Sequence, residues 1–316
     1  MIAFIFPGQG SQKVGMGKAL AGAHPICRDT FAEADEALGQ PLSRLCFEGP
    51  ADELTLTENT QPAILAMSVA VDRLLRSRGL APAWAAGHSL GEYSAHVSAG
   101  TIAFADALRI VRRRGRYMQE AVPVGEGAMS AILGLDAAGV TRACEEAAQG
   151  AVVSPANLNA PGQVVIAGAR EAVARAGERA KALGARRVIP LQVSAPFHCA
   201  LMKPAEDRLA PELRALATSD PRIPVVANVD AEPKREAGAA IEALVRQVSA
   251  PVLWEAVVRR LASEGVRTYV EVGPGTVLTS LVRKIDREAA VASVEDEAGL
   301  AEAEALLRAD SVARSL

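Results

Sequence analysis

Aromatic side chains are scarce in this sequence of 316 residues, of which tryptophan, tyrosine and phenylalanine together make up only 3%. Because 50% of the residues are nevertheless hydrophobic, the core must consist mainly of alanine, valine and leucine. Long apolar runs are also lacking, since no stretch approaches the roughly 20 residues that a membrane-spanning helix needs. We therefore expect a globular protein without a membrane partner, built as about two domains or as one domain with an insertion.

The chain has no excess of basic residues and no closely spaced pair of cysteines. The formal net charge of -3 does not fit the basic footprint of a nucleic-acid-binding protein, so no nucleic-acid partner is expected. Cys27, Cys46, Cys144 and Cys199 lie far apart without a Cys-x-x-Cys pair, which predicts reduced thiols in a cytoplasmic protein. The first six residues are apolar but lack a basic n-region and the length of a secretory h-region, so no export signal is expected.

The most informative stretch is Gly87-His88-Ser89-Leu90-Gly91, a Gly-x-Ser-x-Gly pattern. The short apolar run before it predicts a buried strand, and residues 92–100 predict a helix. A serine on such a strand-to-helix turn is pushed out of the sheet, and the N–H of Leu90 then points to where an oxyanion would form. A tight turn with a hydroxyl cap has the same pattern, so the motif alone leaves both interpretations open.

A second loop of interest follows the apolar run Ile2–Phe6, at Pro7–Gln12. A buried strand that runs into a glycine-rich loop is a usual place for a site in an α/β sheet. A phosphate-binding loop is excluded, because Ala19 lacks the required hydroxyl and Gln12 stands where the first glycine belongs. The loop is either a plain turn or the source of a second backbone N–H for an oxyanion hole.

Residues 101–120 predict a helix that carries Arg112, Arg113, Arg114 and Arg116. At about 100° per residue, Arg112, Arg113 and Arg116 lie on the polar side, whereas Arg114 lies near the margin of the apolar arc. A buried guanidinium needs a partner. Arg114 therefore either forms a structural salt bridge or binds a substrate carboxylate, which arginine holds with two parallel hydrogen bonds.

The pattern of predicted elements changes between residues 127 and 193, where strand, helix, strand, strand, helix and strand follow one another. These elements are predicted at Ala128–Gly134, Asp136–Gln149, Val152–Asn159, Gln163–Ala167, Arg170–Gly184 and Arg187–Val193. The order is βαββαβ, a ferredoxin-like split pattern. We expect an α/β fold with a hydrolase-like parallel-sheet body (1–126 and 194–290), an inserted ferredoxin-like βαββαβ subdomain (127–193) and a C-terminal helical tail (291–316).

The chain has only four histidines, and they differ in how well their positions fit a catalytic role. His24 and His96 lie in predicted helices, as surface or packing residues. His88 precedes the serine and would support its turn. His198 lies beyond a proline in a loop after a strand, where it is either a general base that reaches across a cleft or a satisfied structural residue.

Six stretches together resemble the malonyl-CoA:acyl carrier protein transacylases of fatty-acid synthesis and the acyltransferase domains of polyketide synthases. They are Phe6–Gln12, Gly87–Glu92, Arg114–Gln119, Asn157–Gly168, Pro196–Cys199 and Glu271–Gly275. They occur in the family's order up to about Lys284, and the inserted subdomain is also a family feature. Each stretch is weak alone, but jointly they are specific.

The resemblance implies a ping-pong transfer of a malonyl group from malonyl-CoA to the phosphopantetheine thiol of acyl carrier protein, with no cofactor and no metal. Each matching position then receives a role. Ser89 is the nucleophile, His198 the general base, Gln9 and Leu90 the backbone donors of the oxyanion hole, Arg114 the ligand of the malonyl carboxylate and Gln247 the backbone carbonyl that orients the histidine, while His88, Asn157 and Phe197 line the pocket. Phe197 also resembles members that take malonyl rather than methylmalonyl units.

Two other functions have to be weighed against transacylation. A serine hydrolase or thioesterase would use the same serine with water as the acceptor; Arg114 and the lack of an evident third acid argue against it. A non-catalytic scaffold on the same fold is disfavoured by the intact Ser89, His198 and Arg114. Basic residues at Lys181, Arg186, Arg187, Arg283 and Lys284 are candidates for steering an acidic carrier protein.

Overall fold

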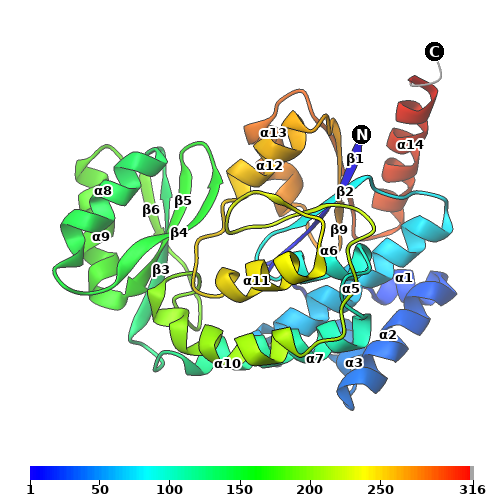
Figure 1. Cartoon of the computed structure of the whole chain (residues 1–316), viewed down its shortest axis with the longest axis horizontal. Helices are drawn as coiled ribbons and strands as arrows, with labels where there is room; N and C mark the ends of the chain where they lie inside the picture. The colour runs from blue at the N-terminus through cyan, green and yellow to red at the C-terminus, as the bar shows by residue number, and fades with distance from the viewer. Residues whose placement is uncertain (314–316) are drawn as a thin grey trace.

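The computed structural model describes residues 1–313, with side chains up to residue 308. Its larger sheet has the strand order β10-β9-β1-β2-β7-β8, in which only the edge strand β8 runs antiparallel to its neighbour (Figure 1). The strands are β1 (Ile2–Phe6), β2 (Trp84–Gly87), β7 (Val225–Val226), β8 (Pro233–Lys234), β9 (Thr268–Val272) and β10 (Ala290–Val294). A mainly parallel sheet brings the carboxyl ends of its strands to one edge, where loops from distant parts of the chain meet.

The central strand β1 is an unbroken apolar run because both of its faces are covered. Alternate side chains of a strand point to opposite faces. Phe4 and Phe6 therefore enter one hydrophobic cluster, and Ala3 and Ile5 enter another on the opposite side. All four side chains are fully buried, as expected for a central strand of a parallel sheet with helices on both faces.

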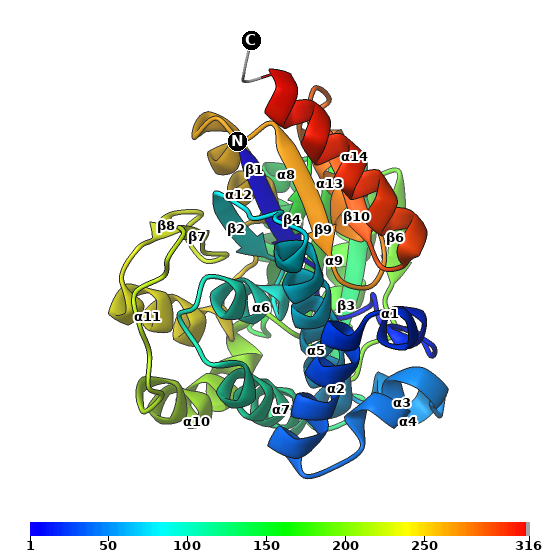
Figure 2. The same cartoon turned by 90° about the vertical axis from the view of Figure 1, so that its right-hand side faces the viewer.

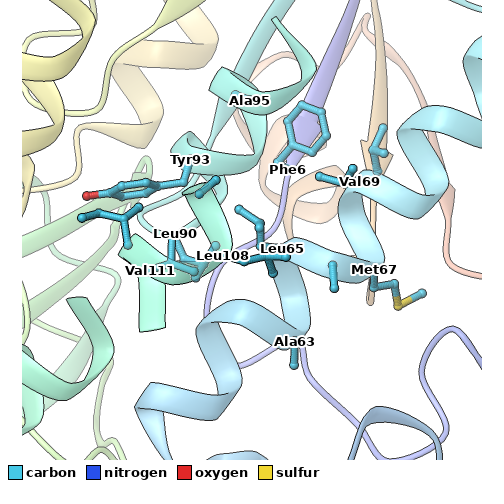
Figure 3. Close-up of a cluster of buried hydrophobic side chains, with 14 of the residues drawn as sticks. Phe6, Ala63, Leu65, Met67, Val69, Leu90, Tyr93, Ala95, Leu108 and Val111 are labelled. Carbon is cyan, nitrogen blue, oxygen red and sulfur yellow. The ribbon is translucent and has the colours of Figure 1, made fainter. Parts of the chain in front are cut away.

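Helices cover the two faces of this sheet unequally (Figure 2). On the Phe4 side lie α2 (Pro25–Leu38), α5 (Thr57–Ser77), α6 (Gly91–Ser98) and α7 (Phe104–Glu120), and on the Ile5 side lie α12 (Trp254–Ser263) and α13 (Val277–Ile285). The remaining helices of the body are α1 (Lys18–Ala23), α3 (Leu42–Glu48), α4 (Ala51–Thr55), a 3₁₀ turn (Ala200–Met202), α10 (Lys203–Arg214) and α11 (Ala237–Gln247). Figure 3 shows Leu65, Leu90 and Val111 packed together beneath the start of α6.

The smaller sheet is antiparallel and has the order β4-β5-β3-β6. It contains β3 (Gly127–Leu133), β4 (Val153–Ala160), β5 (Gln163–Ala169) and β6 (Arg187–Pro190), with α8 (Ala137–Ala148) and α9 (Arg170–Ala182) packed on one face (Figure 1). The element order and the strand order agree with the predicted ferredoxin-like βαββαβ pattern. The α/β fold class predicted from the sequence is therefore confirmed.

The smaller sheet is joined to the body by main-chain contacts. Asn157 on β4 forms a parallel bridge with Val252, whose N–H donates to Ala156 O at 2.9 Å and whose carbonyl accepts from Leu158 N at 2.9 Å. At the other end of this sheet, Gly127 packs so closely on Pro196 that an added Cβ would lie 2.4 Å from the proline ring. The loop that carries His198 is thereby held against the start of β3.

The C-terminal segment differs from the prediction of a helical tail over 291–316. Residues 290–294 form β10, an edge strand parallel to β9, and only then does α14 (Glu297–Ala313) begin and pack against β10. The last three residues of the predicted tail lie outside the described residues. The strand escaped prediction because Ala290–Val294 is only five residues long and its two valines, Val291 and Val294, do not follow the alternation of a half-buried strand.

Smaller differences concern element ends. The helix predicted from residue 101 begins at Phe104. The helical region predicted over residues 24–45, with breaks at Gly39 and Pro41, is formed by α2 and α3, which are separated at those residues as expected. No helix within residues 1–313 is long and apolar enough to cross a membrane.

Candidate active site

The turn between β2 and α6 holds Ser89 in an unusual backbone conformation. Its φ of 53° is left-handed, and only three other non-glycine residues among those described, one of them His198, have a positive φ. The turn needs its two glycines because a Cβ on Gly87 would lie 1.9 Å from Gly91 C, and one on Gly91 would lie 2.0 Å from Phe6 O. Strand β1, the turn and α6 are thus in close backbone contact, and the serine side chain projects at the carboxyl edge of the sheet.

Ser89 and His198 form a hydrogen-bonded pair. The Ser89 Oγ lies 2.6 Å from His198 Nε2, and His198 Nδ1 lies 3.0 Å from the backbone carbonyl of Gln247. The carbonyl can only accept, so it requires the proton on Nδ1 and leaves Nε2 as the acceptor for the serine hydroxyl. A main-chain oxygen occupies the place that a carboxylate takes in Ser-His-Asp hydrolases, as the sequence led us to expect for Gln247.

Two backbone N–H groups beside Ser89 have no acceptor among the described residues. They belong to Leu90, the N-cap residue directly before α6, and to Gln9, in the loop after β1. The N–H of Ser89 itself is engaged, because it donates to Asn228 Oδ1 at 2.7 Å. The N–H groups of Leu90 and Gln9 are therefore available to bind an oxyanion, the role expected for Leu90 from its turn and for Gln9 from the family resemblance.

Arg114 lies behind the serine and is 1% exposed. Its Nη2 donates to Ser89 Oγ at 3.2 Å and to Gln247 Oε1 at 2.9 Å, and its Nη1 donates to Gln61 Oε1 at 2.8 Å. Every one of these acceptors is neutral, and no carboxylate among the described residues lies within ion-pair distance of the guanidinium. The structural salt bridge that the sequence left open is therefore absent from the described residues.

Burial makes the electrostatics of the site unusual. The pKa of His198 is lowered to about 3, chiefly by burial and secondly by the positive charge of Arg114. The imidazole is therefore neutral at physiological pH and free to accept a proton. Burial also lowers the pKa of Arg114 from its ordinary value, and the nearby Tyr93 and Glu92 offset this shift only in part.

A cavity of about 200 Å³ opens in front of Ser89, between the body and the smaller sheet. Its lining includes the predicted pocket residues His88, Asn157 and Phe197, together with Gln9 and Met129. His88 is held by a 2.8 Å contact between its Nε2 and Asn159 Oδ1. The other two histidines take no part, since His24 contacts Glu297 and His96 is buried beside Thr101.

Sequence reasoning missed three side chains that hold this arrangement in place: Gln61, Asn228 and Glu92. Gln61 precedes Pro62 inside α5, and Asn228 follows the short apolar run that ends β7. Polar residues at the carboxyl end of a buried strand are a signal that would have drawn attention to Asn228. Gln61 and Glu92 look like ordinary helix residues, and only their burial distinguishes them.

A serine bonded to a neutral imidazole, with two unengaged N–H groups beside it, is the arrangement of enzymes that transfer acyl groups through a serine ester. Comparison with known proteins narrows this class. The model of the acyl transferase domain family matches residues 3–307, and the chain belongs to that family. The protein is an acyltransferase, and the resemblance drawn from its motifs is confirmed.

Two relatives of known name are similar to this chain over nearly their whole length. The malonyl CoA-acyl carrier protein transacylase of Escherichia coli (strain K12) is 57% identical over 284 residues, which cover 90% of this chain and 92% of the relative. That of Bacillus subtilis (strain 168) is 49% identical, with 93% of each chain covered. Among solved structures, an acyl carrier protein S-malonyltransferase from Vibrio cholerae superposes with a TM-score of 0.94 at 50% identity, covering 96% of this chain and 99% of that one.

A further solved structure contains a partner. It is a type II PKS acyl-carrier protein in complex with its malonyl-transacylase. The matched chain is 52% identical to this one and superposes with a TM-score of 0.93, and the match covers 95% of this chain and 97% of that chain.

Proposed function

We propose that the protein transfers the malonyl group of malonyl-CoA to the phosphopantetheine thiol of acyl carrier protein, through a malonyl ester on Ser89. The observation that carries the proposal is the buried guanidinium of Arg114, whose Nη2 lies 3.2 Å from Ser89 Oγ and which has no acidic partner among the described residues. Only one methylene separates the two carbonyl carbons of a malonyl group. The distal carboxylate of an acyl group on Ser89 therefore arrives where this cation is available.

The first half of the reaction forms the ester. His198 Nε2 takes the proton of Ser89 Oγ as this oxygen attacks the thioester carbonyl, and the Gln247 carbonyl keeps the imidazole in the required tautomer. The tetrahedral oxyanion lies between the N–H groups of Leu90 and Gln9. The carbon–sulfur bond then breaks, and the imidazolium returns its proton to the thiolate of CoA.

The second half repeats these steps with a new thiol. CoA leaves, and the phosphopantetheine arm of acyl carrier protein enters the cavity of about 200 Å³ that Phe197 and Met129 line. His198 takes the proton of the incoming thiol, which attacks the malonyl ester. The carbon–oxygen bond to Ser89 breaks, the serine oxygen regains the proton, and malonyl-carrier protein leaves to supply extender units for fatty-acid or polyketide synthesis.

Every proton and electron pair in this scheme is handled by groups of the chain and its two substrates. We therefore propose that the enzyme needs no metal or other cofactor. We also propose a cytoplasmic location, which is supported by four buried cysteines that form no disulfide.

The test is intact-protein mass spectrometry after exposure to malonyl-CoA, with and without carrier protein. The wild type should gain the mass of one malonyl group and lose it when carrier protein is added, while Ser89→Ala should gain nothing and keep its melting temperature, because one half-buried hydroxyl contributes little to packing. An equal adduct on the Ala variant would disprove the role of Ser89. Rapid release of free malonate without carrier protein would instead favour the serine hydrolase.

A further inference from the structure

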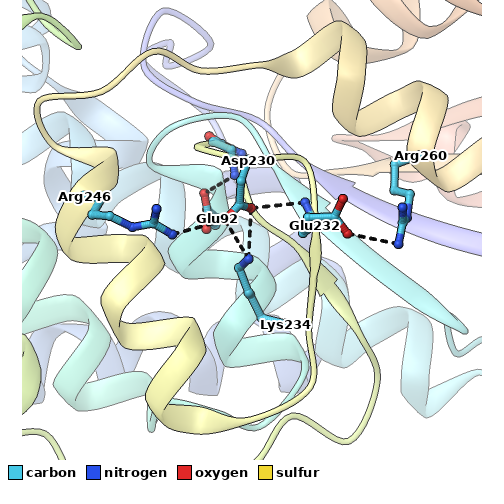
Figure 4. Close-up of polar contacts among 7 residues, drawn as sticks. Glu92, Asp230, Glu232, Lys234, Arg246 and Arg260 are labelled. Carbon is cyan, nitrogen blue, oxygen red and sulfur yellow. Dashed lines mark hydrogen bonds and ion pairs between the residues drawn. The ribbon is translucent and has the colours of Figure 1, made fainter.

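Glu92 is a fully buried acid in the first turn of α6 that takes no direct part in the transfer steps. Its Oε2 accepts two hydrogen bonds, from Gln247 Nε2 at 2.8 Å and from Asn228 N at 3.0 Å. Its Oε1 has no partner. Figure 4 shows Glu92 beside a group of surface ion pairs, but Lys234 and Arg246 bond to Asp230 and not to Glu92.

The contact with Glu92 determines which way the side-chain amide of Gln247 faces. Oε2 of Glu92 already accepts the N–H of Asn228 and so offers a lone pair to Gln247, and the carbonyl of Ser89, which receives a second bond from the same Nε2 at 2.9 Å, can only accept. The nitrogen of the amide must therefore face Glu92 and the Ser89 carbonyl. The oxygen is left to face Arg114, where it accepts from Nη2 at 2.9 Å.

A rotated amide would point its NH₂ group at a guanidinium, which has only donors to offer. Arg114 would then lose one of the three oxygens that hold it and would be free to leave the orientation that places it beside Ser89. Only substrates whose acyl group carries a carboxylate depend on that orientation.

We propose that Glu92 is a specificity-determining positioning residue, which fixes the Gln247 amide so that its oxygen holds Arg114 in place for the carboxylate of the acyl group. This inference rests on the proposed malonyl transfer. In this role Glu92 acts through the hydrogen bonds that Oε2 accepts, and its electrostatic interaction with Arg114 is a separate contribution.

The position of Oε2 and the charge can be separated by two conservative variants. Glu92→Gln removes the charge but can place its oxygen where Oε2 lies, with its NH₂ group at the site of the partnerless Oε1. Glu92→Asp keeps the charge but withdraws the carboxylate by one methylene, about 1.5 Å, from Gln247 and Asn228. The readout is the ratio of kcat/KM for malonyl-CoA to kcat/KM for acetyl-CoA in transfer to carrier protein.

The matched control is Glu271, the other fully buried glutamate, whose carboxylate accepts the N–H groups of Leu278 and Thr279 at the start of α13. Burial raises the pKa of both glutamates to about 7, so their substitutions are also alike electrostatically. Glu271→Asp and Glu271→Gln should lower the melting temperature and leave the malonyl:acetyl ratio within about twofold of wild type, because Glu271 touches no group of the site.

We expect Glu92→Asp to lower the malonyl:acetyl ratio by about tenfold or more and Glu92→Gln to keep it within about threefold, even if both lose thermal stability. An unchanged ratio in the Asp variant would overturn the inference. So would a large loss in the Gln variant, and this result decides the matter alone if the Asp protein does not fold. A failure of the proposed function is distinguishable, since the wild type would then transfer no malonyl group.

Discussion

At the residue scale, the site depends on a few buried polar side chains that hold one another by specific hydrogen bonds. Arg114 is the clearest case, because a buried cation with three neutral oxygen partners is stabilised less than one with a carboxylate. The incoming carboxylate of a substrate supplies the missing counter-charge. Selectivity for a charged acyl group and incomplete charge compensation in the free protein thus have the same physical origin.

Arg114→Ala should reduce malonyl transfer by roughly two orders of magnitude or more, at about 1.4 kcal/mol per tenfold, because the carboxylate then faces a pocket without a cation. Acetyl transfer should be unchanged or faster. Arg114→Lys should restore only part of the malonyl rate, since an ammonium group lacks the planar fork. Both acyl-transfer rates and the melting temperature are measured on one preparation, and a parallel fall of both rates with the melting temperature would contradict this role.

The acid side of the pH profile depends on His198 and its neighbour Arg114. A neutral imidazole is needed for acylation, and a pKa of about 3 means that it stays neutral as the pH falls from 7 to 5. In wild type, kcat/KM for acetyl-CoA should therefore stay level over this interval. Burial is the larger cause of the shift and remains in Arg114→Ala, but removing the cation raises the pKa of His198 and should move the acid limb upward.

Acetyl-CoA is the substrate of choice for this measurement, because its acyl group carries no carboxylate to respond to the loss of Arg114. A wild-type profile that falls with a midpoint near 6.5, the ordinary value for histidine, would show that the imidazole is not shielded as described.

At the element scale, the contact between β1 and α6 is what allows a serine to project from the sheet. Gly91→Ala should lower the free energy of unfolding by about 3 kcal/mol or more, because the new Cβ would lie 2.0 Å from the carbonyl oxygen of Phe6 and the backbone must shift. Gly238→Ala, in the first turn of α11, is the control. With nothing within 4 Å of its Cβ, it should be stabilising by up to about 1 kcal/mol. Urea unfolding of both variants is the measurement, and equal midpoints would refute the close-contact argument.

At the scale of the whole molecule, the cavity lies where the two sheets meet. We propose that residues 1–126 and 194–290 act as one body and that residues 127–193 act as an inserted subdomain. The strand β10 and helix α14 then extend the body beyond residue 290. The Lys284 ammonium group donates to Gln163 Oε1 at 2.9 Å, so the end of α13 adjoins the turn between β4 and β5.

The predicted carrier-protein surface follows from this arrangement. Reversing the charge at Arg186 and Lys284 should raise the apparent KM for carrier protein and leave that for malonyl-CoA unchanged, because an acidic partner is steered by exposed cations. The effect should weaken at high salt. Lys18→Glu on α1, which lies on the other side of the molecule from α8 and α9 in Figure 1, makes a matched control. Equal effects on both substrates, or as large an effect in the control, would place the carrier protein elsewhere.

The sequence by itself determined those parts of the protein that depend on short-range pattern. The apolar run of β1, the two glycines around Ser89 and the βαββαβ order can each be recognised within a few residues or within one segment, because backbone geometry and alternating burial act locally. The short edge strand β10 lacked such a pattern and was missed.

Only the tertiary structure decided how the distant residues of the site are held. Ser89 and His198 are 109 positions apart, and His198 and the Gln247 carbonyl 49. The Gln9, His198 and Gln247 roles came from resemblance and not from spacing. The roles of Gln61, Asn228 and Glu92 were not foreseen, because a polar residue on a helix or after a short strand acquires a specific partner only when packing removes water from it. That burial is a property of the whole fold, which no local stretch of sequence contains.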